Sequence, residues 1–295
     1  MSAPIMPLAS PAERERALAV AFGGSVVVKL GGRTQDEPAL AEALAALWRR
    51  TDGRLVVVHG GGDAVSALQR ARGIEPAFVG GRRVTTDADL DVVRMALSGL
   101  ANKQLVARLL AVGVPALGLS GEDGALLQAA PGRDARLGRV GEPARVNVPL
   151  LALLLGAGYC PVVSPVSTVA DGHGVPRGQP LNVNGDDAAA AVAVAIGAAE
   201  LFFLADVAGV LVDGAPVGEL DREGCEALVA AGTVVGGMAA KLEAARAALS
   251  AGVARVRVGD LAALADATGA ARGTAIVPTL ADAGPSVVRV VPAAG

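Results

Sequence analysis

The stretch Ser25-Val26-Val27-Val28-Lys29-Leu30-Gly31-Gly32 is an apolar, β-branched run that ends in two glycines. Such a run predicts a strand that is covered on both faces, as in a parallel sheet. A similar run, Arg54-Leu55-Val56-Val57-Val58-His59, ends in Gly60-Gly61-Gly62 and follows an Ala/Leu-rich stretch. A strand, a helix and a second buried strand in this order predict a βαβ unit, and therefore an α/β fold with a mainly parallel sheet.

The same alternation continues along the chain. Further strands are expected at Ala116–Leu119, Cys160–Ser164, Leu201–Leu204 and Arg255–Val258. Helices are expected at Glu37–Arg50, Asp63–Arg72, Thr86–Leu100, Asn102–Val112, Pro149–Ala157, Asp186–Ile196, Arg222–Ala231 and Met238–Ser250, with a further candidate at Pro11–Phe22. The stretch Gln128–Val148 predicts hairpins, and the Gly- and Pro-rich stretch Val169–Pro180 predicts a loop that joins two lobes.

The composition indicates a folded enzyme-sized chain and argues against several classes of partner. The chain has 295 residues, of which 52% are hydrophobic and 19% charged, enough for one large α/β domain or two joined lobes. Aromatic residues make up only 2%, the formal net charge is −3, and no basic run is present, so we expect no nucleic-acid binding. Apolar runs such as Leu150–Leu155 are too short to cross a bilayer, and Met1–Pro11 has no basic leader. We therefore expect no membrane association and a cytoplasmic location, in which Cys160 and Cys225 are buried, reduced thiols.

The two glycine turns predict an anion site. Consecutive glycines after a parallel strand let the backbone approach a ligand, and their N–H groups, with the next helix N-terminus, attract anions. Gly31, Gly32 and Gly60 are therefore candidate phosphate-binding residues. The alternative is that both are merely tight turns between strand and helix. Neither turn matches the P-loop pattern, and three consecutive glycines do not match the dinucleotide-binding spacing.

Two lysines are candidates for holding the anion. Lys29 lies on an otherwise apolar strand, and an ammonium buried without a partner would cost several kcal/mol or more, in the range of ~3–7. Lys241 follows Gly236-Gly237-Met238 near the expected start of a helix. The alternatives are a surface position at a strand end for Lys29 and a solvated helix position for Lys241. We expect no metal-ligand cluster of protein side chains, and a buried structural role for His59.

A third group, Asn182-Val183-Asn184-Gly185-Asp186-Asp187, precedes an Ala-rich helix. Alternate asparagines on an extended segment point the same way. Either aspartate could simply cap the helix. The functional reading is that a carboxylate at Asp186 fixes two phosphate-binding lysines.

Taken in order, these segments resemble the amino acid kinase superfamily, and within it the N-acetylglutamate kinases. The resemblance covers residues 25 to 277 and rests on Val27-Val28-Lys29-Leu30-Gly31-Gly32, Val57-Val58-His59-Gly60-Gly61-Gly62, Gly81-Arg82-Arg83-Val84-Thr85, Asn102-Lys103, Gly118-Leu119-Ser120-Gly121-Glu122-Asp123-Gly124, Asn182-Val183-Asn184-Gly185-Asp186, Asp206-Val207-Ala208-Gly209-Val210-Leu211 and Gly236-Gly237-Met238-Ala239-Ala240-Lys241. It implies a three-layer αβα sandwich of two lobes. Residues 1–22 would be an extension, 23–180 a lobe that binds the acid and dimerises, and 181–295 a lobe that binds ATP.

The resemblance also implies a role for each matching residue. Lys29 and Lys241 would stabilise the transferring phosphoryl group, and Asp186 would hold both lysines. Gly61 and Gly62 would contact the acid and, with Gly32, donate backbone hydrogen bonds. Arg83 and Asn182 would bind the α-carboxylate of the substrate. The nucleotide would lie on Asp206, Val207, Ala208, Gly209, Val210, Leu211, Gly236, Gly237 and Met238.

The implied reaction is phosphorylation of the γ-carboxylate of N-acetyl-L-glutamate by ATP, with Mg²⁺ brought in by the nucleotide. A carboxylate is already ionised near neutral pH, so no general base is required. The alternatives are a related acid, such as N-succinylglutamate or a carrier-bound aminoadipate or glutamate, and a non-catalytic sensor on the same scaffold. A carrier would call for a basic rim, to which Arg82, Arg83, Arg133, Arg136 and Arg139 could contribute.

The sequence also departs from the family pattern. The chain has Gly185 where Ala is frequent, and the contacts of Arg33-Thr34-Gln35 are not defined by the pattern. The segment Val256–Ala262 lacks the motif of arginine-inhibited members, so we expect a dimer without arginine inhibition.

Overall fold

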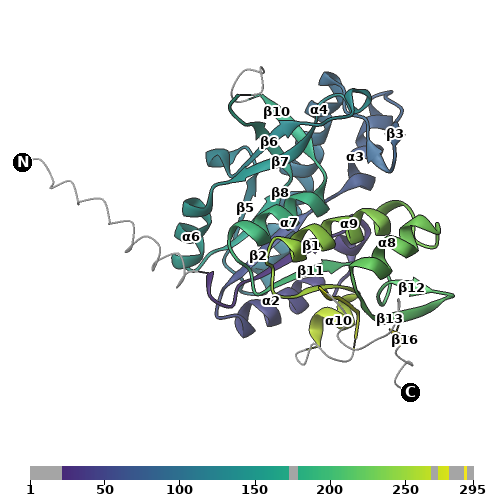
Figure 1. Ribbon diagram of the computed structural model, residues 1–295. Coiled ribbons are helices and arrows are strands. Elements are labelled where there is room, and N and C mark those ends of the chain that lie inside the picture. The colour runs from purple at the N-terminus through teal and green to yellow at the C-terminus, as the bar shows by residue number, and fades with distance from the viewer. Residues whose placement is uncertain (1–21, 173–178, 267–271, 279–288, 291–295) are drawn as a thin grey trace, which may run out of the picture.

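The computed structural model describes residues 22–172, 179–266, 272–278 and 289–290. Apart from Phe22, the helix candidate Pro11–Phe22 lies outside these residues. A ten-stranded sheet forms the centre of the molecule, with helices on both faces (Figure 1). In spatial order its strands are β12 (Leu211–Val212), β13 (Ala215–Leu220), β15 (Thr274–Ile276), β14 (Val256–Gly259), β11 (Glu200–Leu204), β1 (Val26–Leu30), β2 (Leu55–His59), β8 (Cys160–Ser164) and β5 (Ala116–Ser120), and β16 (Arg289–Val290) pairs with β13.

The six strands expected from the sequence form the parallel centre of this sheet. They are neighbours in the order β14-β11-β1-β2-β8-β5, and each pair is parallel. Antiparallel pairs occur only beyond β14 among the described strands of this sheet, at β14–β15, β12–β13 and β13–β16. The expectation of a mainly parallel sheet is therefore confirmed.

Alternate residues of the central strands face two separate cores. Val27 and Phe203 pack on the face covered by α7 (Gly185–Ala195) and α9 (Gly236–Ser250), to which α6 (Val148–Gly156) and α8 (Arg222–Ala230) also contribute. Val28 and Phe202 pack on the opposite face against α2 (Leu40–Arg50), α5 (Asn102–Ala111) and α10 (Leu261–Ala265). Because side chains alternate along a strand, Lys29 shares the face of Val27 and points toward α7 and α9.

A smaller sheet and a hairpin lie beside the large sheet. The strands β10 (Pro180–Val183), β7 (Val140–Val146), β6 (Leu127–Pro131) and β9 (Val166–Val169) close into a small barrel. The antiparallel β6–β7 pair confirms the hairpin expected within Gln128–Val148. A short hairpin joins β3 (Phe78–Val79) to β4 (Arg82–Arg83). The loop expected at Val169–Pro180 connects β9 to β10, and its residues 173–178 lie outside the description, so the lobe boundary stays a prediction.

One long helical segment replaces two helices that the sequence predicted separately. Thr86 begins α4 (Asp87–Val93) with a capping box that it shares with Asp89. A π-helix, η2 (Arg94–Ala101), follows without a break and continues into α5. π-helical segments are frequent at functional sites, and Leu97 of this one lines the site described below. The remaining elements are η1 (Arg33–Asp36), α3 (Gly62–Ala71), η3 (Asp123–Ala125) and η4 (Ala135–Leu137).

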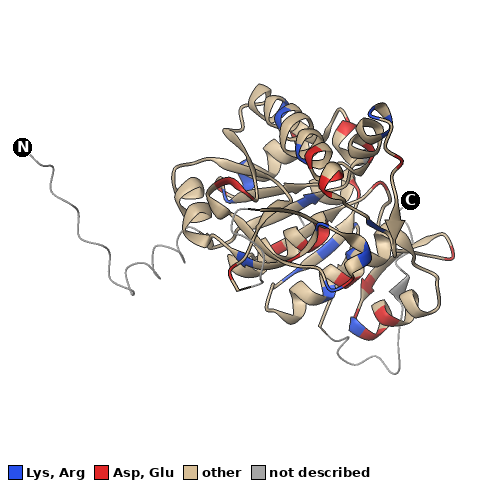
Figure 2. Ribbon diagram, turned by 90° about the horizontal axis from the view of Figure 1, so that it is seen from above, with Lys and Arg blue, Asp and Glu red and all other residues tan. Residues whose placement is uncertain are grey.

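Charged residues of both signs are spread over the structure (Figure 2), and the two cysteines are buried as expected. Basic and acidic segments are interspersed along the ribbon (Figure 2). Both cysteines are free and buried, and burial raises the pKa of the Cys160 thiol to about 12. None of the helices in the described ranges has both the length and the hydrophobicity that a bilayer span requires.

Candidate active site

A pocket opens at the carboxyl ends of β1 and β2, where ligands of open α/β sheets bind. Its cavity volume is about 220 Å³. The residues predicted from sequence that line it are Lys29, Gly32, Gly60, Gly61, Gly62, Arg83, Asn182 and Asp186. The structure thus brings together residues that are up to 157 positions apart in the chain (186 − 29).

Two lysines converge on one aspartate at the wall of this pocket. Lys29 Nζ lies 2.8 Å from Asp186 Oδ1, and Lys241 Nζ lies 3.5 Å from Asp186 Oδ2. The side chains of Lys29, Asp186 and Lys241 are only 7%, 6% and 13% exposed. The alternative surface positions considered for the two lysines are therefore wrong.

Three elements place this cluster. Lys29 is on the α7-facing side of β1, Asp186 is in the first turn of α7, and Lys241 is on α9. The helices α7 and α9 pack against each other (Figure 1). The cap of α7 is Asn184, whose Oδ1 accepts a hydrogen bond from the Asp186 N–H at 2.7 Å. The alternative that Asp186 or Asp187 caps this helix is thus wrong, and the Asp186 carboxylate is available to the lysines.

The cluster carries a surplus of positive charge. One carboxylate cannot neutralise two ammonium groups, and a buried net charge is unfavourable without an anion. Burial lowers the pKa of Lys241, and the nearby charge of Lys29 lowers it further, whereas Asp186 opposes both effects. An anionic ligand that entered the pocket would relieve this repulsion, so the cluster is suited to bind phosphate oxygens.

The glycine turns supply backbone donors beside the cluster. Gly61 caps α3 with φ +150°, a conformation open in practice only to glycine, and a Cβ there would lie 2.7 Å from Leu97 Cδ2. The first amides of α3 have no intrahelical acceptor and attract anions. Gly31 does not line the pocket, and its carbonyl accepts a hydrogen bond from Thr34 Oγ1 at 3.1 Å. The pocket is therefore lined by Gly32 rather than by Gly31.

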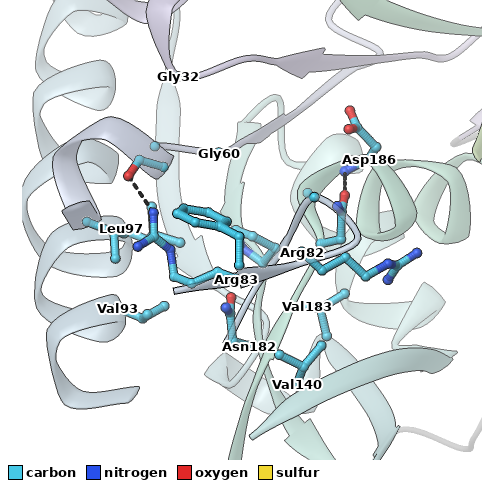
Figure 3. Close-up of a pocket in the computed structure, with 18 of the residues that line it drawn as sticks. Gly32, Gly60, Arg82, Arg83, Val93, Leu97, Val140, Asn182, Val183 and Asp186 are labelled. Atoms are coloured by element: carbon cyan, nitrogen blue, oxygen red, sulfur yellow. Dashed lines mark hydrogen bonds between the residues drawn. The ribbon is translucent and has the colours of Figure 1, made fainter. Parts of the chain in front are cut away.

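Arg83 and Asn182 stand at the part of the pocket away from the lysines. The Arg83 guanidinium donates hydrogen bonds of 2.8 Å to the Gly62 carbonyl and to Ser66 Oγ, and its centre lies 4.8 Å from the Phe78 ring centroid. Asn182 Nδ2 donates to Thr85 Oγ1 at 3.0 Å. Figure 3 shows Arg83 beside the glycine turn, with Val93 and Leu97 on one side of the pocket and Asp186 on the other. These hydrogen bonds go to neutral acceptors, and the carboxylates of Asp63 and Asp89 act on the guanidinium only as nearby charges. The guanidinium can therefore pair with a carboxylate that enters the pocket.

Sequence reasoning missed part of the lining. Phe78, Leu97, Pro165 and Val183 contribute apolar walls, and nothing in their local pattern distinguishes them from ordinary core residues. It also missed the ion pair in which Arg82 lies 2.9 Å from Asp187.

The residues expected to bind nucleotide lie at the same edge of the sheet. The segment Asp206–Leu211 follows β11, the neighbour of β1, and Gly236–Met238 form the first turn of α9. Within this segment, Val210 is turned toward the protein interior. Its side chain is buried, its N–H donates to Thr274 Oγ1, and its carbonyl accepts a hydrogen bond from the Val217 N–H. Any direct contact with a ligand would thus come from the neighbours of Val210.

His59 is buried behind the pocket, in agreement with the structural role expected for it. Its Nδ1 is 2.8 Å from the Gly60 carbonyl, and its Nε2 is 3.0 Å from Asn102 Nδ2. Burial lowers the pKa of His59 to about 4. The imidazole is consequently neutral near pH 7 and takes no part as a charged group.

The arginines considered for a basic rim have partners in the described structure. Arg133 pairs with Glu142, Arg136 with Asp134, Arg139 with Asp87 and Arg82 with Asp187. A search of the described residues for three or more neighbouring His, Cys, Asp or Glu side chains that could hold a metal ion finds no group.

Comparisons with known proteins agree with this geometry. A family model described as the amino acid kinase family matches residues 20–260. An acetylglutamate kinase of Geobacillus kaustophilus is 45% identical over 230 residues, which cover 78% of this chain and 87% of that protein. An acetylglutamate kinase of Chloroflexus aurantiacus is 43% identical over 242 residues, covering 81% and 93%. The solved structure of smu.665 from Streptococcus mutans UA159 has a TM-score of 0.77 at 27% identity, and the match covers 87% of this chain and 99% of that one.

Proposed function

Since the chain belongs to the amino acid kinase family, we propose that it transfers the γ-phosphoryl group of ATP to the γ-carboxylate of N-acetyl-L-glutamate. The product would be N-acetyl-L-glutamyl 5-phosphate, and the reaction is the second step of arginine biosynthesis. The observation that carries the proposal is the pairing of Lys29 and Lys241 with Asp186 at a pocket walled by glycine turns. The relatives that share this fold at 43–45% identity are acetylglutamate kinases.

The chemistry follows from the charges in the pocket. A carboxylate oxygen of the substrate attacks the γ-phosphorus, the bond from that phosphorus to the β,γ-bridging oxygen breaks, and ADP leaves. Negative charge spreads over the phosphoryl oxygens in the transition state, so positioned cations and N–H donors supply most of the catalysis. Lys29 and Lys241 would neutralise this charge, with the amides of Gly32 and Gly61 as further donors. The substrate is the Mg²⁺ complex of ATP, in which phosphate oxygens and water hold most of the metal's coordination sites.

The acid would bind between the glycine turn and the β3–β4 hairpin. Arg83 offers a planar guanidinium that suits a bidentate contact with the α-carboxylate, and Asn182 stands beside it. The segments Asp206–Leu211 and Gly236–Met238 would hold the nucleotide on the other side of the lysine pair. We include in this proposal a cytoplasmic homodimer whose N-terminal lobe forms the subunit contact.

Two alternatives are less well supported. A carrier-bound substrate would need free basic side chains, whereas four of the five arginines considered for that role are ion-paired in the described structure. A non-catalytic sensor would not need two lysines held on one buried aspartate.

A substrate panel with one variant tests the proposal. ADP release is measured with ATP and Mg²⁺ on N-acetylglutamate, N-succinylglutamate and free glutamate. We expect the highest kcat/KM on N-acetylglutamate. In Lys241→Met, kcat should fall by at least about 10²-fold, the usual cost of losing one transition-state donor, while nucleotide binding persists.

The matched control is Arg246→Gln, which removes a positive charge from the same helix at a residue paired with Glu226. Its kcat should stay close to that of the wild type. Higher activity on another acid would reject the proposed substrate, and an unchanged kcat in Lys241→Met would reject the role of this lysine.

A further inference from the structure

Gln35 lies in η1, just past the first glycine turn, and has no part in the mechanism above. Gln35 is only 8% exposed. Its side-chain Nε2 donates to two carbonyls, that of Gly31 at 3.2 Å and that of Gly60 at 2.9 Å. One amide group therefore bridges the two glycine turns, which follow different strands.

Both carbonyls have a second donor, so their hydrogen-bonding capacity is filled. Thr34 Oγ1 donates to the Gly31 carbonyl at 3.1 Å, and His59 Nδ1 lies 2.8 Å from the Gly60 carbonyl. A carbonyl oxygen only accepts, so Nδ1 of His59 carries the proton. The neutral ring then leaves Nε2 to accept from Asn102 Nδ2 at 3.0 Å. Each carbonyl oxygen has two lone pairs, and each now meets two donors.

The orientation of these carbonyls decides where the next amides point. A trans peptide is planar, with its C=O and N–H directed to opposite sides. The Gly31 carbonyl shares a peptide with the Gly32 N–H, and the Gly60 carbonyl shares one with the Gly61 N–H. Gly32 and Gly61 line the pocket and also a second cavity of about 200 Å³, so their peptides lie between the two spaces. Gln35 lines only the second cavity, together with Asp63 and Arg108.

We propose that Gln35 is a positioning residue, which holds the Gly31–Gly32 and Gly60–Gly61 peptides so that both N–H groups face the phosphoryl group being transferred. Gln35 does not touch the substrate. If either peptide turned over, a carbonyl oxygen would face the phosphoryl oxygens and repel them. The anchor of Gln35 is the Arg108 guanidinium, which donates to the Gln35 and Glu37 backbone carbonyls. This inference rests on the proposed phosphoryl transfer, but not on which acid accepts the group.

The test is Gln35→Glu, which keeps the shape of the side chain and replaces the NH2 group, with its two N–H donors, by a carboxylate oxygen. The matched control is Gln104→Glu, the same change at an exposed residue that lines the same second cavity. We expect kcat of Gln35→Glu to fall by about 10- to 100-fold, with the KM of ATP little changed. Gln104→Glu should match the wild type.

A pH profile separates positioning from general stability. Protonation of the carboxylate introduced by Gln35→Glu restores one donor, so the ratio of variant to wild-type kcat should rise as the pH is lowered. Binding of ADP with Mg²⁺ and aluminium fluoride, a mimic of the transferring group, should weaken more than binding of ADP alone. If Gln35→Glu fails to fold, Gln35→Met, which lacks both donors and adds no charge, is measured in the same way.

The two proposals fail in different ways. If the wild type prefers another acid, that acid replaces N-acetylglutamate in these assays and the role of Gln35 is still tested. A kcat within twofold of the wild type, or equal losses of affinity for ADP with and without aluminium fluoride, would overturn the positioning role.

Discussion

The surroundings of Lys241 act on its charge in opposite directions. Asp186 holds its ammonium group, while burial and Lys29 lower its pKa below the ordinary value of 10.5. Only the charged form can neutralise a phosphoryl oxygen. We therefore expect Lys241 to lose the charge that its proposed role requires at a lower pH than an ordinary lysine would.

This predicts the alkaline side of the pH profile. As the pH rises through the lowered pKa, Lys241 loses its proton and kcat/KM, which reports groups of the free enzyme, should fall before pH 10.5 is reached. Arginine stays charged to pH values above about 12. In Lys241→Arg the alkaline fall should move upward, even though the different shape of arginine lowers the maximum. Rates measured from about pH 7 to about pH 11 decide this, and an alkaline fall at the same pH in both proteins would rule out Lys241 as its source.

A second prediction concerns Gly61. Its φ of +150° is strained for any other residue, and a Cβ there would lie 2.7 Å from Leu97 Cδ2. Gly61→Ala should lower the free energy of unfolding by about 1–3 kcal/mol and reduce kcat, because the turn must move. Gly73→Ala is the matched control, since Gly73 also has a positive φ of +74° but has nothing within 4 Å of the added methyl group. Urea unfolding and kcat are compared, and equal effects in the two variants would contradict the close contact as the cause.

At the scale of elements, the β3–β4 hairpin contacts the N-terminal ends of α7 and α9. Its Arg82 pairs with Asp187 of α7 at 2.9 Å, and its turn residue Gly81 lies next to Gly236 at the start of α9. Burial raises the pKa of Asp187, and Arg82 opposes that shift. Because the same hairpin carries Arg83, the ion pair joins the residue proposed to bind the acid to the helix that bears Asp186.

A double-mutant cycle measures this link. Arg82→Gln and Asp187→Asn should each raise the KM of the acid, and their effects should be less than additive, with a coupling energy of about 0.5–1 kcal/mol for a partly exposed pair. The Arg133–Glu142 pair is the control, because the Arg133 side chain is 92% exposed and the pair is 3.5 Å apart. Strictly additive effects of the Arg82 and Asp187 changes on KM would show that the hairpin and α7 act independently.

At the scale of the whole molecule, burial of neutral His59 makes stability depend on pH. The pKa of His59 is lowered from 6.5 to about 4, so the unfolded chain binds a proton that the folded protein rejects between these values. Stability is thus lost as the pH falls from 6.5 toward 4, by an amount of about 3 kcal/mol from this group.

Urea unfolding from about pH 7.5 down to about pH 4 tests this in the wild type and in His59→Gln. The variant should be less stable at the upper end of this range, since a buried hydrogen-bonded ring is replaced. The difference between the two proteins should then shrink as the pH falls. Carboxylates titrate in the same range in both proteins, so only the difference is diagnostic. A difference that stays constant over the whole range would show that His59 is not the group responsible.

Much of this architecture could be predicted from local patterns. Buried parallel strands are continuous apolar runs, and for that reason all six expected strands are found as the contiguous centre of the sheet. The glycines mark the strand ends, and a lysine within an apolar run indicates an anion nearby. The strands that were missed lie toward the edge of the large sheet and in the small barrel. They have only two to six residues, and polar residues, glycine or proline interrupt most of them, so no continuous apolar run marks them.

The amino-acid order alone settled which residues are chemically unusual. A lysine within an apolar strand and consecutive glycines at a strand end can each be recognised from the local sequence, because their effect on burial or on the backbone arises at that position. The amino-acid order could not settle which distant groups would meet. The bridging of two turns by Gln35 and the pairing of Arg82 with Asp187 depend on the packing of elements in three dimensions. Hydrogen bonds and ion pairs act over only a few ångströms, so the fold had to bring the partners together before these roles could be assigned.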